Sequence, residues 1–118
     1  MEKEFVTYEQ AIILNKLGYD GDYNYTYDIK KELWYGDIKA DGEKYIAAPL
    51  KQQVLRWFRE KYKKYANLFS WLHEEEIGKY HEFEIYEQDE YAYGSDKFKT
   101  YEEAENACID KLIELVNN

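Results

Sequence analysis

The chain has 118 residues, a formal net charge of −9, and 45% hydrophobic and 19% aromatic residues. This length predicts one domain, because two halves would each be too small to bury a self-sufficient core. So acidic a chain is disfavoured as a ligand of anionic membranes or free nucleic acid. It has no apolar run near the ~20 residues that span a bilayer and no start typical of a signal peptide. The sequence therefore predicts a cytoplasmic protein.

The first and last predicted helices begin with the same capping signal. Thr7 precedes Gln10, and Thr100 precedes Glu103, at the spacing of a capping box, in which each side chain satisfies the other residue's backbone amide. Gly18 marks the end of the first helix. Apolar residues follow each start at helical spacing: Ala11, Leu14 and Leu17 in the first, and Ala104, Cys108, Leu112 and Leu115 in the last.

A middle helix is predicted to follow Pro49, which suits a first helical turn because it has no amide to satisfy. Its inner stripe is predicted to be Leu50, Val54, Trp57, Phe58 and Tyr65. Its outer face is predicted to carry the basic residues Lys51, Arg56, Arg59, Lys63 and Lys64.

Strand candidates separate the helices. They are Tyr23–Tyr27, Leu33–Tyr35, Glu43–Ile46 with a turn before it at Lys39–Gly42, a hairpin of Leu68–His73 and Lys79–Tyr86 turned at Glu75–Gly78, and Tyr91–Tyr93. This order predicts an α+β fold, a small antiparallel sheet packed against about three helices in a single domain of residues 1–118.

Charge is strongly segregated along the chain. Residues 49–66 carry six basic side chains and one acidic, whereas residues 74–93 carry eight acidic and one basic. Alternation along a strand would place Glu82 and Glu84 on one face, with carboxylates about 6.8 Å apart. The predicted partner-binding residues are Glu74, Glu75, Glu76, Tyr80, Glu82, Glu84, Tyr86, Glu87, Asp89, Glu90, Tyr91 and Tyr93.

Such a carboxylate ladder with flanking tyrosine rings could occupy a basic nucleic-acid groove of another protein, with the charges in place of phosphates and the rings in place of bases. The simplest alternative is a solvated face of an acidic sheet. The basic helix offers two more interpretations: direct RNA binding with Trp57 or Tyr62 stacking on a base, or self-association with the acidic hairpin.

Catalytic and metal-binding patterns are weak. His73 and His81 lie on different predicted strands, and no spacing joins them to a carboxylate in a recognisable site. Cys108 falls at a core position, where a buried thiol is the usual role. The six glycines are scattered singly, without a phosphate-binding loop. We expect a protein that is not an enzyme and holds neither metal nor cofactor.

Three stretches carry a resemblance: residues 5–20, 48–65 and 100–116, together 51 of the 118 residues. Their strings (FVTYEQAIILNKLGYD, APLKQQVLRWFREKYKKY and TYEEAENACIDKLIELV) resemble a family of short proteins of prophages and mobile elements of Bacteroidota, mostly of unassigned function. The acidic hairpin lies outside these stretches.

The resemblance implies a context rather than catalytic residues. Small acidic phage proteins include inhibitors of host defence, among them anti-CRISPR proteins that block RNA-guided nucleases. The resemblance thus implies a host nucleic-acid-handling protein as the partner, in the first place a CRISPR effector nuclease, whose channels for guide and target are strongly basic.

Overall fold

The computed structural model describes residues 2–36, 45–72 and 79–117. The described residues form three α-helices, a 3-10 helix (η1, Glu2–Glu4) and two three-stranded antiparallel sheets. The α+β class predicted from the sequence is confirmed, and the strands divide between two sheets rather than forming one. The chain consists of two compact units, residues 1–54 and 55–116, and α2 (Lys51–Tyr62) contributes to both.

The first unit begins with the capping box that the sequence predicts. The Thr7 hydroxyl accepts from the Gln10 amide at 3.1 Å, and the Gln10 side chain accepts from the Thr7 amide at 2.9 Å. Helix α1 follows over Tyr8–Lys16 and ends before Gly18, whose φ of 84° only glycine adopts without strain. Ala11 and Leu14 are buried, as expected of the inner stripe.

The sheet of the first unit has the order β2-β1-β3, formed by Leu33–Tyr35, Tyr25–Tyr27 and Ile46–Ala47. The predicted strand Tyr23–Tyr27 is therefore shorter than expected, and the predicted turn Lys39–Gly42 lies outside the described residues. The buried Tyr27 hydroxyl donates to the Val6 carbonyl at 2.6 Å, which ties the sheet to the segment before α1.

Asp28 closes the connection between β1 and β2. Its carboxylate accepts from the Lys30 amide at 2.8 Å, the Glu32 amide at 3.0 Å and the Trp34 indole at 2.8 Å. The side chain is buried, so these donors replace the water that the charge has lost. The Glu32 amide, followed by the Trp34 indole, lowers the pKa of this carboxyl below its ordinary value.

This network predicts an acid-sensitive first unit. Because the pKa of Asp28 is lower in the folded than in the unfolded chain, its stabilisation is present above the ordinary pKa of about 4 and is lost as pH falls through the folded value. Thermal unfolding between neutral pH and strong acid should show wild type more stable than Asp28→Asn at neutral pH, with the difference shrinking in acid. A difference that does not change with pH would contradict the role of the charge.

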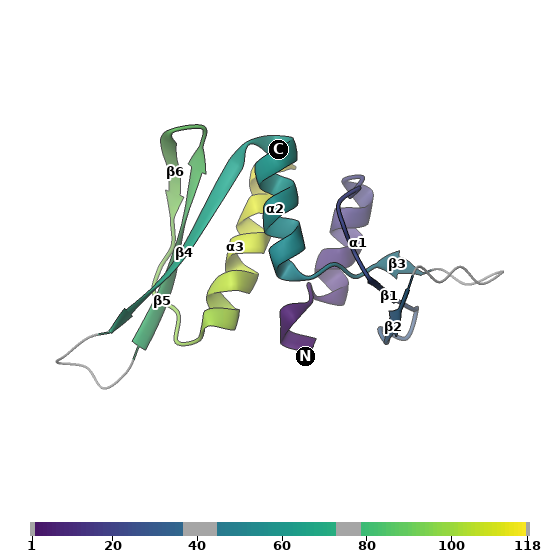
Figure 1. Ribbon diagram of the computed structural model, residues 1–118. Helices are drawn as coiled ribbons and strands as arrows, with labels where there is room; N and C mark the ends of the chain where they lie inside the picture. The colour runs from purple at the N-terminus through teal and green to yellow at the C-terminus, as the bar shows by residue number, and fades with distance from the viewer. Residues whose placement is uncertain (1, 37–44, 73–78, 118) are drawn as a thin grey trace. The chain divides into compact units, whose positions relative to one another are not determined.

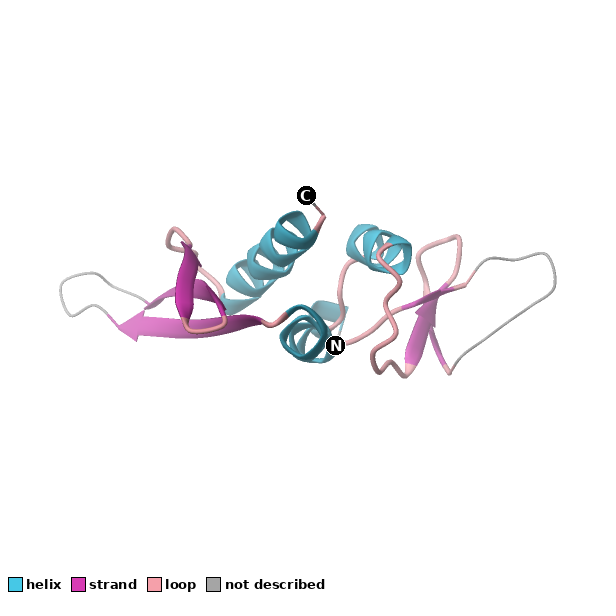
Figure 2. Ribbon diagram, turned by 90° about the horizontal axis from the view of Figure 1, so that it is seen from above, coloured by secondary structure: helices cyan, strands magenta, loops and turns pink. Residues whose placement is uncertain are grey.

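The second unit contains the longer sheet, in the order β4-β5-β6. Its strands are Lys64–Leu72, Lys79–Glu87 and Glu90–Gly94, and helix α3 spans Tyr101–Val116. Figure 1 shows α3 beside these strands, and Figure 2 shows it on one side of them. Thr100 caps α3 by accepting from the Glu103 amide at 3.1 Å. The predicted capping box forms only in this half, since the Glu103 carboxylate accepts from the Thr100 hydroxyl rather than from the Thr100 amide.

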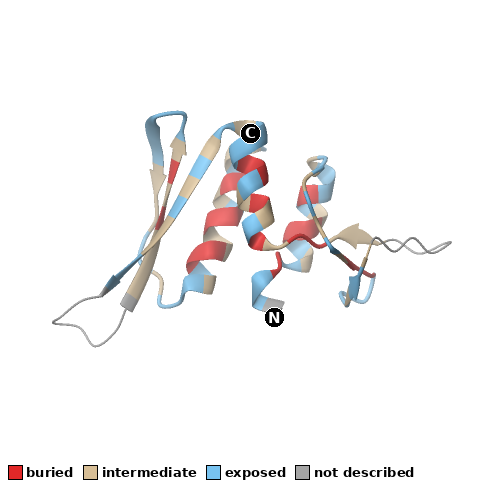
Figure 3. Ribbon diagram, viewed as in Figure 1, coloured by how far each residue is buried: buried red, intermediate tan, exposed pale blue. Residues whose placement is uncertain are grey.

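The core of the second unit lies between α3 and the face of the sheet that we call the inner face. Phe83 and Ile85 of β5 are buried there, as are the α3 residues Cys108, Ile109 and Leu112. In Figure 3 the buried positions of this unit lie on α2, along α3 and in the middle of β5. Cys108 is buried as predicted, and that burial raises the pKa of its thiol to about 12.

The basic run does not form one helical face, and two expectations about it were wrong. Lys51 is only 2% exposed, because positions 51, 54 and 58 share one side of a helix and Val54 and Phe58 are core residues. The helix ends at Tyr62, so Tyr65 belongs to β4 and is 40% exposed. Lys63, which lies between the end of α2 and the start of β4, has a left-handed φ of 57° that ends the helix.

Candidate protein-binding face of the second sheet

The face of the sheet opposite α3, which we call the outer face, can be assigned because side chains of successive strand residues point to opposite faces. Since Phe83 and Ile85 point to α3, Glu82 and Glu84 point the other way, and directly opposed residues on neighbouring strands share a face. The register therefore adds their partners on β4 and β6. The outer face comprises Tyr65, Asn67, Phe69 and Trp71 of β4, Tyr80, Glu82, Glu84 and Tyr86 of β5, and Tyr91 of β6.

Both outer-face carboxylates are held by aromatic side chains. The Trp71 indole donates to Glu82 Oε2 at 3.1 Å across the strands. The Tyr86 hydroxyl donates to Glu84 Oε2 at 2.7 Å along its own strand, and this hydrogen bond raises the pKa of the phenol. A charged acceptor strengthens such bonds, so each carboxylate is oriented while its remaining lone pairs stay available.

The aromatic rings of the outer face contact one another in two groups. Trp71 stacks on Tyr80 with ring centroids 6.4 Å apart and meets Phe69 edge to face at 5.7 Å. Tyr86 meets Tyr91 edge to face at 5.8 Å. Trp71 and Tyr91 are 49% and 62% exposed, so large rings face solvent on both sides of the two carboxylates. Exposed aromatic residues of this kind are enriched in protein-binding surfaces.

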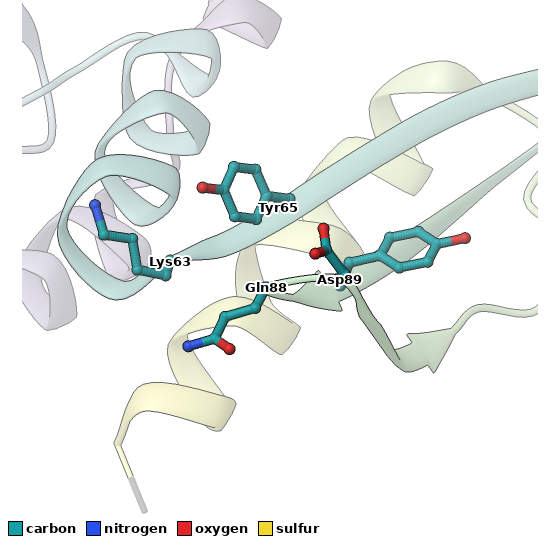
Figure 4. Close-up of a pocket in the computed structure, with 5 residues that line it drawn as sticks. Lys63, Tyr65, Gln88 and Asp89 are labelled. Carbon is teal, nitrogen blue, oxygen red and sulfur yellow. The ribbon is translucent and has the colours of Figure 1, made fainter.

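A hollow of about 750 Å³ adjoins one end of the outer face. It lies where α2 meets β4 and β5 turns into β6, and Figure 4 shows the side chains around it. The lining residues are Lys63, Tyr65, Tyr86, Gln88 and Asp89. The Lys63 ammonium donates to the Glu60 carbonyl at 3.1 Å, back along the helix. The hollow thus adds the Asp89 carboxylate to the outer face beside two tyrosine rings.

Gln88 in this hollow has a φ of 56°. Residues other than glycine adopt this left-handed backbone conformation with difficulty, because their Cβ atom is crowded there. Gln88→Gly should therefore raise the free energy of unfolding by up to ~1 kcal/mol. The same change at Asp89, whose φ is not positive, should lower it. Urea unfolding of both variants measures the difference, and destabilisation by Gln88→Gly would contradict strain at this turn.

The structure brings together only part of the predicted acidic ladder. Glu82, Glu84, Tyr80, Tyr86 and Tyr91 share the outer face, with Asp89 at its end. Glu87 pairs instead with Lys64 at 2.6 Å, and Glu90 lies opposite Glu87 at the turn. Glu74, Glu75, Glu76 and His73 lie outside the described residues.

Tyr93 lies on the inner face, unlike Tyr91. It is opposite Ile85, its ring lies 5.7 Å from that of Phe83, and the Lys111 ammonium sits 4.4 Å from the centre of the ring. The cause is a register shift: Tyr91 pairs with Tyr86 but Tyr93 with Ile85, so β6 carries one extra residue between them. The bulge therefore places Tyr93 on the opposite face of the sheet from Tyr91, Tyr86 and Tyr80, the other tyrosines predicted to bind a partner.

The predicted basic patch is likewise dispersed. Arg56 pairs with Glu60 at 3.0 Å on the exposed side of α2, and Arg59 is exposed nearby. Lys51 is buried, Lys63 ends the helix and Lys64 begins β4, where its side chain is only 13% exposed. Trp57, a predicted stacking residue, is 5% exposed. These positions therefore do not present one basic surface.

Sequence reasoning missed the β4 half of the outer face: Tyr65, Asn67, Phe69 and Trp71. The available signal was the set of aromatic residues Tyr65, Phe69 and Trp71, all at odd positions, since aromatic residues favour strands. Lys63 is neither glycine nor proline, so no residue type marked the end of the helix.

Comparisons with protein-family models, curated proteins and solved structures find no match. Among the residues described, no group of three or more His, Cys, Asp or Glu side chains is placed to hold a metal ion. None of the helices in the described ranges has the length and apolar character that crossing a lipid bilayer requires.

Proposed function

We propose that this chain is a non-enzymatic binding protein of the bacterial cytoplasm, and that its outer face occupies a basic nucleic-acid groove of a host protein. The partner we propose first is an RNA-guided CRISPR nuclease, which the protein would inhibit by obstructing the channel. The observation that carries the proposal is the row of Glu82 and Glu84 between exposed aromatic rings on one sheet face.

The spacing of these groups suits such a groove. Carboxylates two residues apart on a strand recur about every 6.8 Å, which is about half the charge density of one nucleic-acid strand with its phosphate every ~3.4 Å. The exposed flanking rings of Trp71 and Tyr91 offer stacking surfaces at the places where bases would lie.

Orientation of the carboxylates favours binding further. Because Trp71 and Tyr86 already hold Glu82 and Glu84, less side-chain entropy is lost when a partner arginine or lysine engages them. The net charge of −9 would speed association with a basic surface and make the rate sensitive to salt. The resemblance to mobile-element proteins supports a partner in host defence.

The test uses purified RNA-guided nucleases of Bacteroidota, each with and without its guide RNA. Size-exclusion chromatography and a DNA-cleavage assay measure binding and inhibition at low and high salt. We expect a complex that salt dissociates, in which the protein competes with target DNA. If no nuclease is bound, and a pull-down from a Bacteroidota lysate returns only partners that do not handle nucleic acid, the proposed partner class is wrong.

A further inference from the structure

The free edge of β4 is a second feature that the proposed function does not use. Within the described residues, β4 pairs with β5 alone, along its whole length of nine residues. The opposite side of β5 is filled, by β6 at residues 84–87 and by residues 95–98 beyond them. We propose that β4 pairs with β4 of a second copy of this chain, so that two sheets join into one of six strands.

The backbone groups that point to this edge can be assigned. His81 exchanges hydrogen bonds with Phe98, and the Ser95 amide donates to the Phe83 carbonyl at 3.0 Å, so both β5 residues bond away from β4. Backbone groups of successive strand residues point to alternate edges. Residues 80, 82, 84 and 86 therefore bond β4 residues 71, 69, 67 and 65. It follows that residues 64, 66, 68, 70 and 72 of β4 direct their amides and carbonyls outward.

The strand lacks the devices that normally protect such an edge. Natural edge strands are short, or carry proline, inward-pointing charges or bulges. The sequence KYANLFSWL has no proline and no acidic residue, and its one charge, Lys64, stands at the beginning. The other sheet edges are shorter, with five residues in β6, three in β2 and two in β3. An edge strand of this length and composition is a template for another strand.

A second copy of β4 fits this edge in one symmetric register. Antiparallel pairing about Leu68 places Leu68 opposite itself, Ala66 opposite Ser70 and Lys64 opposite Leu72, and all of these are outward-directed positions. On the outer face the same register sets Tyr65 against Trp71 and Asn67 against Phe69. Aromatic cross-strand pairs are stabilising, and no like charges meet. Because the twofold contact uses the same edge on both copies, assembly stops at a dimer.

The effect of salt distinguishes this contact from the proposed function. Two chains of charge −9 repel each other, so added salt should leave the dimer unchanged or strengthen it. Binding of a basic partner, or self-association between the basic helix and the acidic hairpin, should weaken with salt. The experiments can therefore contradict the dimer without contradicting inhibition of a nuclease. They can equally contradict inhibition without contradicting the dimer.

The test combines molecular mass with residue-resolved amide exchange. We expect light scattering to give twice the monomer mass of 14.3 kDa as the concentration rises from micromolar to millimolar. NMR exchange should show the amides of Ala66, Leu68 and Ser70 becoming protected over the same range, whereas those of Asn67 and Phe69 are protected throughout. A monomer at every concentration, a dimer with fast exchange at Ala66, Leu68 and Ser70, or a dimer that salt dissociates would each overturn the proposal.

A matched pair of variants at Ser70 tests the edge directly. Ser70→Pro removes an outward amide and leaves the bonds to β5, whereas Ser70→Ala keeps that amide. Both variants lose the hydrogen bond of 2.6 Å between the Ser70 hydroxyl and His81. Ser70→Pro should raise the dimer dissociation constant roughly thirtyfold, because two inter-chain hydrogen bonds are lost per dimer. Equal dissociation constants for the two variants would overturn the β4 contact, and the exchange experiment on wild type decides the question if Ser70→Pro does not fold.

Discussion

Reversing both outer-face charges, by Glu82→Lys and Glu84→Lys, is expected to weaken binding of the partner by about a hundredfold or more. Truncating one member of a buried interfacial charge pair costs about 2–5 kcal/mol, and reversal adds repulsion from the basic groove. The dissociation constant, measured by calorimetry or by titration of nuclease inhibition, checks this. Unchanged affinity would remove the outer face from the mechanism.

Two control variants separate charge from structure. Glu82→Gln with Glu84→Gln keeps an acceptor oxygen for Trp71 and Tyr86 but removes the charge, so binding should weaken less than on reversal. Glu4→Lys with Asp22→Lys makes the same change in net charge at exposed positions of the first unit, and affinity should barely change. Loss of affinity in that control would indicate a response to total charge alone.

The pKa of Tyr86 reports whether the Glu84 carboxylate accepts from the phenol. It is raised because the phenol donates to the Glu84 carboxylate. In Glu84→Gln and Glu84→Lys that negative acceptor is gone, so the pKa of Tyr86 should fall toward the ordinary value of about 10. NMR titration of the assigned Tyr86 ring resonances measures this pKa. The chemical shifts of the other outer-face residues show whether the sheet persists in each variant.

Phe83→Ala is expected to lower the free energy of unfolding by about 3–5 kcal/mol. Phe83 is 2% exposed, stacks on Phe98 with centroids 6.2 Å apart and packs on the inner face under α3. Truncation leaves a cavity among side chains that cannot all move to fill it. Urea unfolding monitored by circular dichroism gives the magnitude.

The matched control is Phe69→Ala, the same truncation on the outer face of the neighbouring strand. Its ring is half-buried on the face away from Phe83, so the loss of stability should be clearly smaller than at Phe83. Equal losses at the two positions would mean that the outer face is covered by packed structure. That outcome would contradict both the assignment of the two faces and the availability of the outer face to a partner.

Local signals in the sequence predicted what depends on neighbouring residues. The capping contacts of Thr7 and Thr100, the left-handed Gly18 and the α+β class all follow from short-range chemistry. The alternation of β5 predicted that Glu82 and Glu84 share a face away from Phe83, and the burial of Phe83 agrees. These features need no knowledge of which strands pair.

Features that depend on which strands pair, and in which register, could not be predicted from the sequence. The contribution of β4 to the outer face requires the register of β4 against β5, which short tyrosine-rich strands leave open. The separation of Tyr93 from Tyr91 follows from a bulge that no glycine or proline marks. The end of α2 depends on the left-handed backbone of Lys63, a conformation that its residue type does not suggest.

Cys108 gives the second unit a built-in indicator of conformational opening. It is the only cysteine of the chain, it is fully buried on the side of α3 that faces the sheet, and this burial raises the pKa of its thiol to about 12. A thiol reagent at neutral pH therefore reacts with it only when α3 separates from the sheet. The rate of labelling consequently measures how often that happens, and a surface cysteine introduced for a fluorophore can be labelled selectively without replacing Cys108.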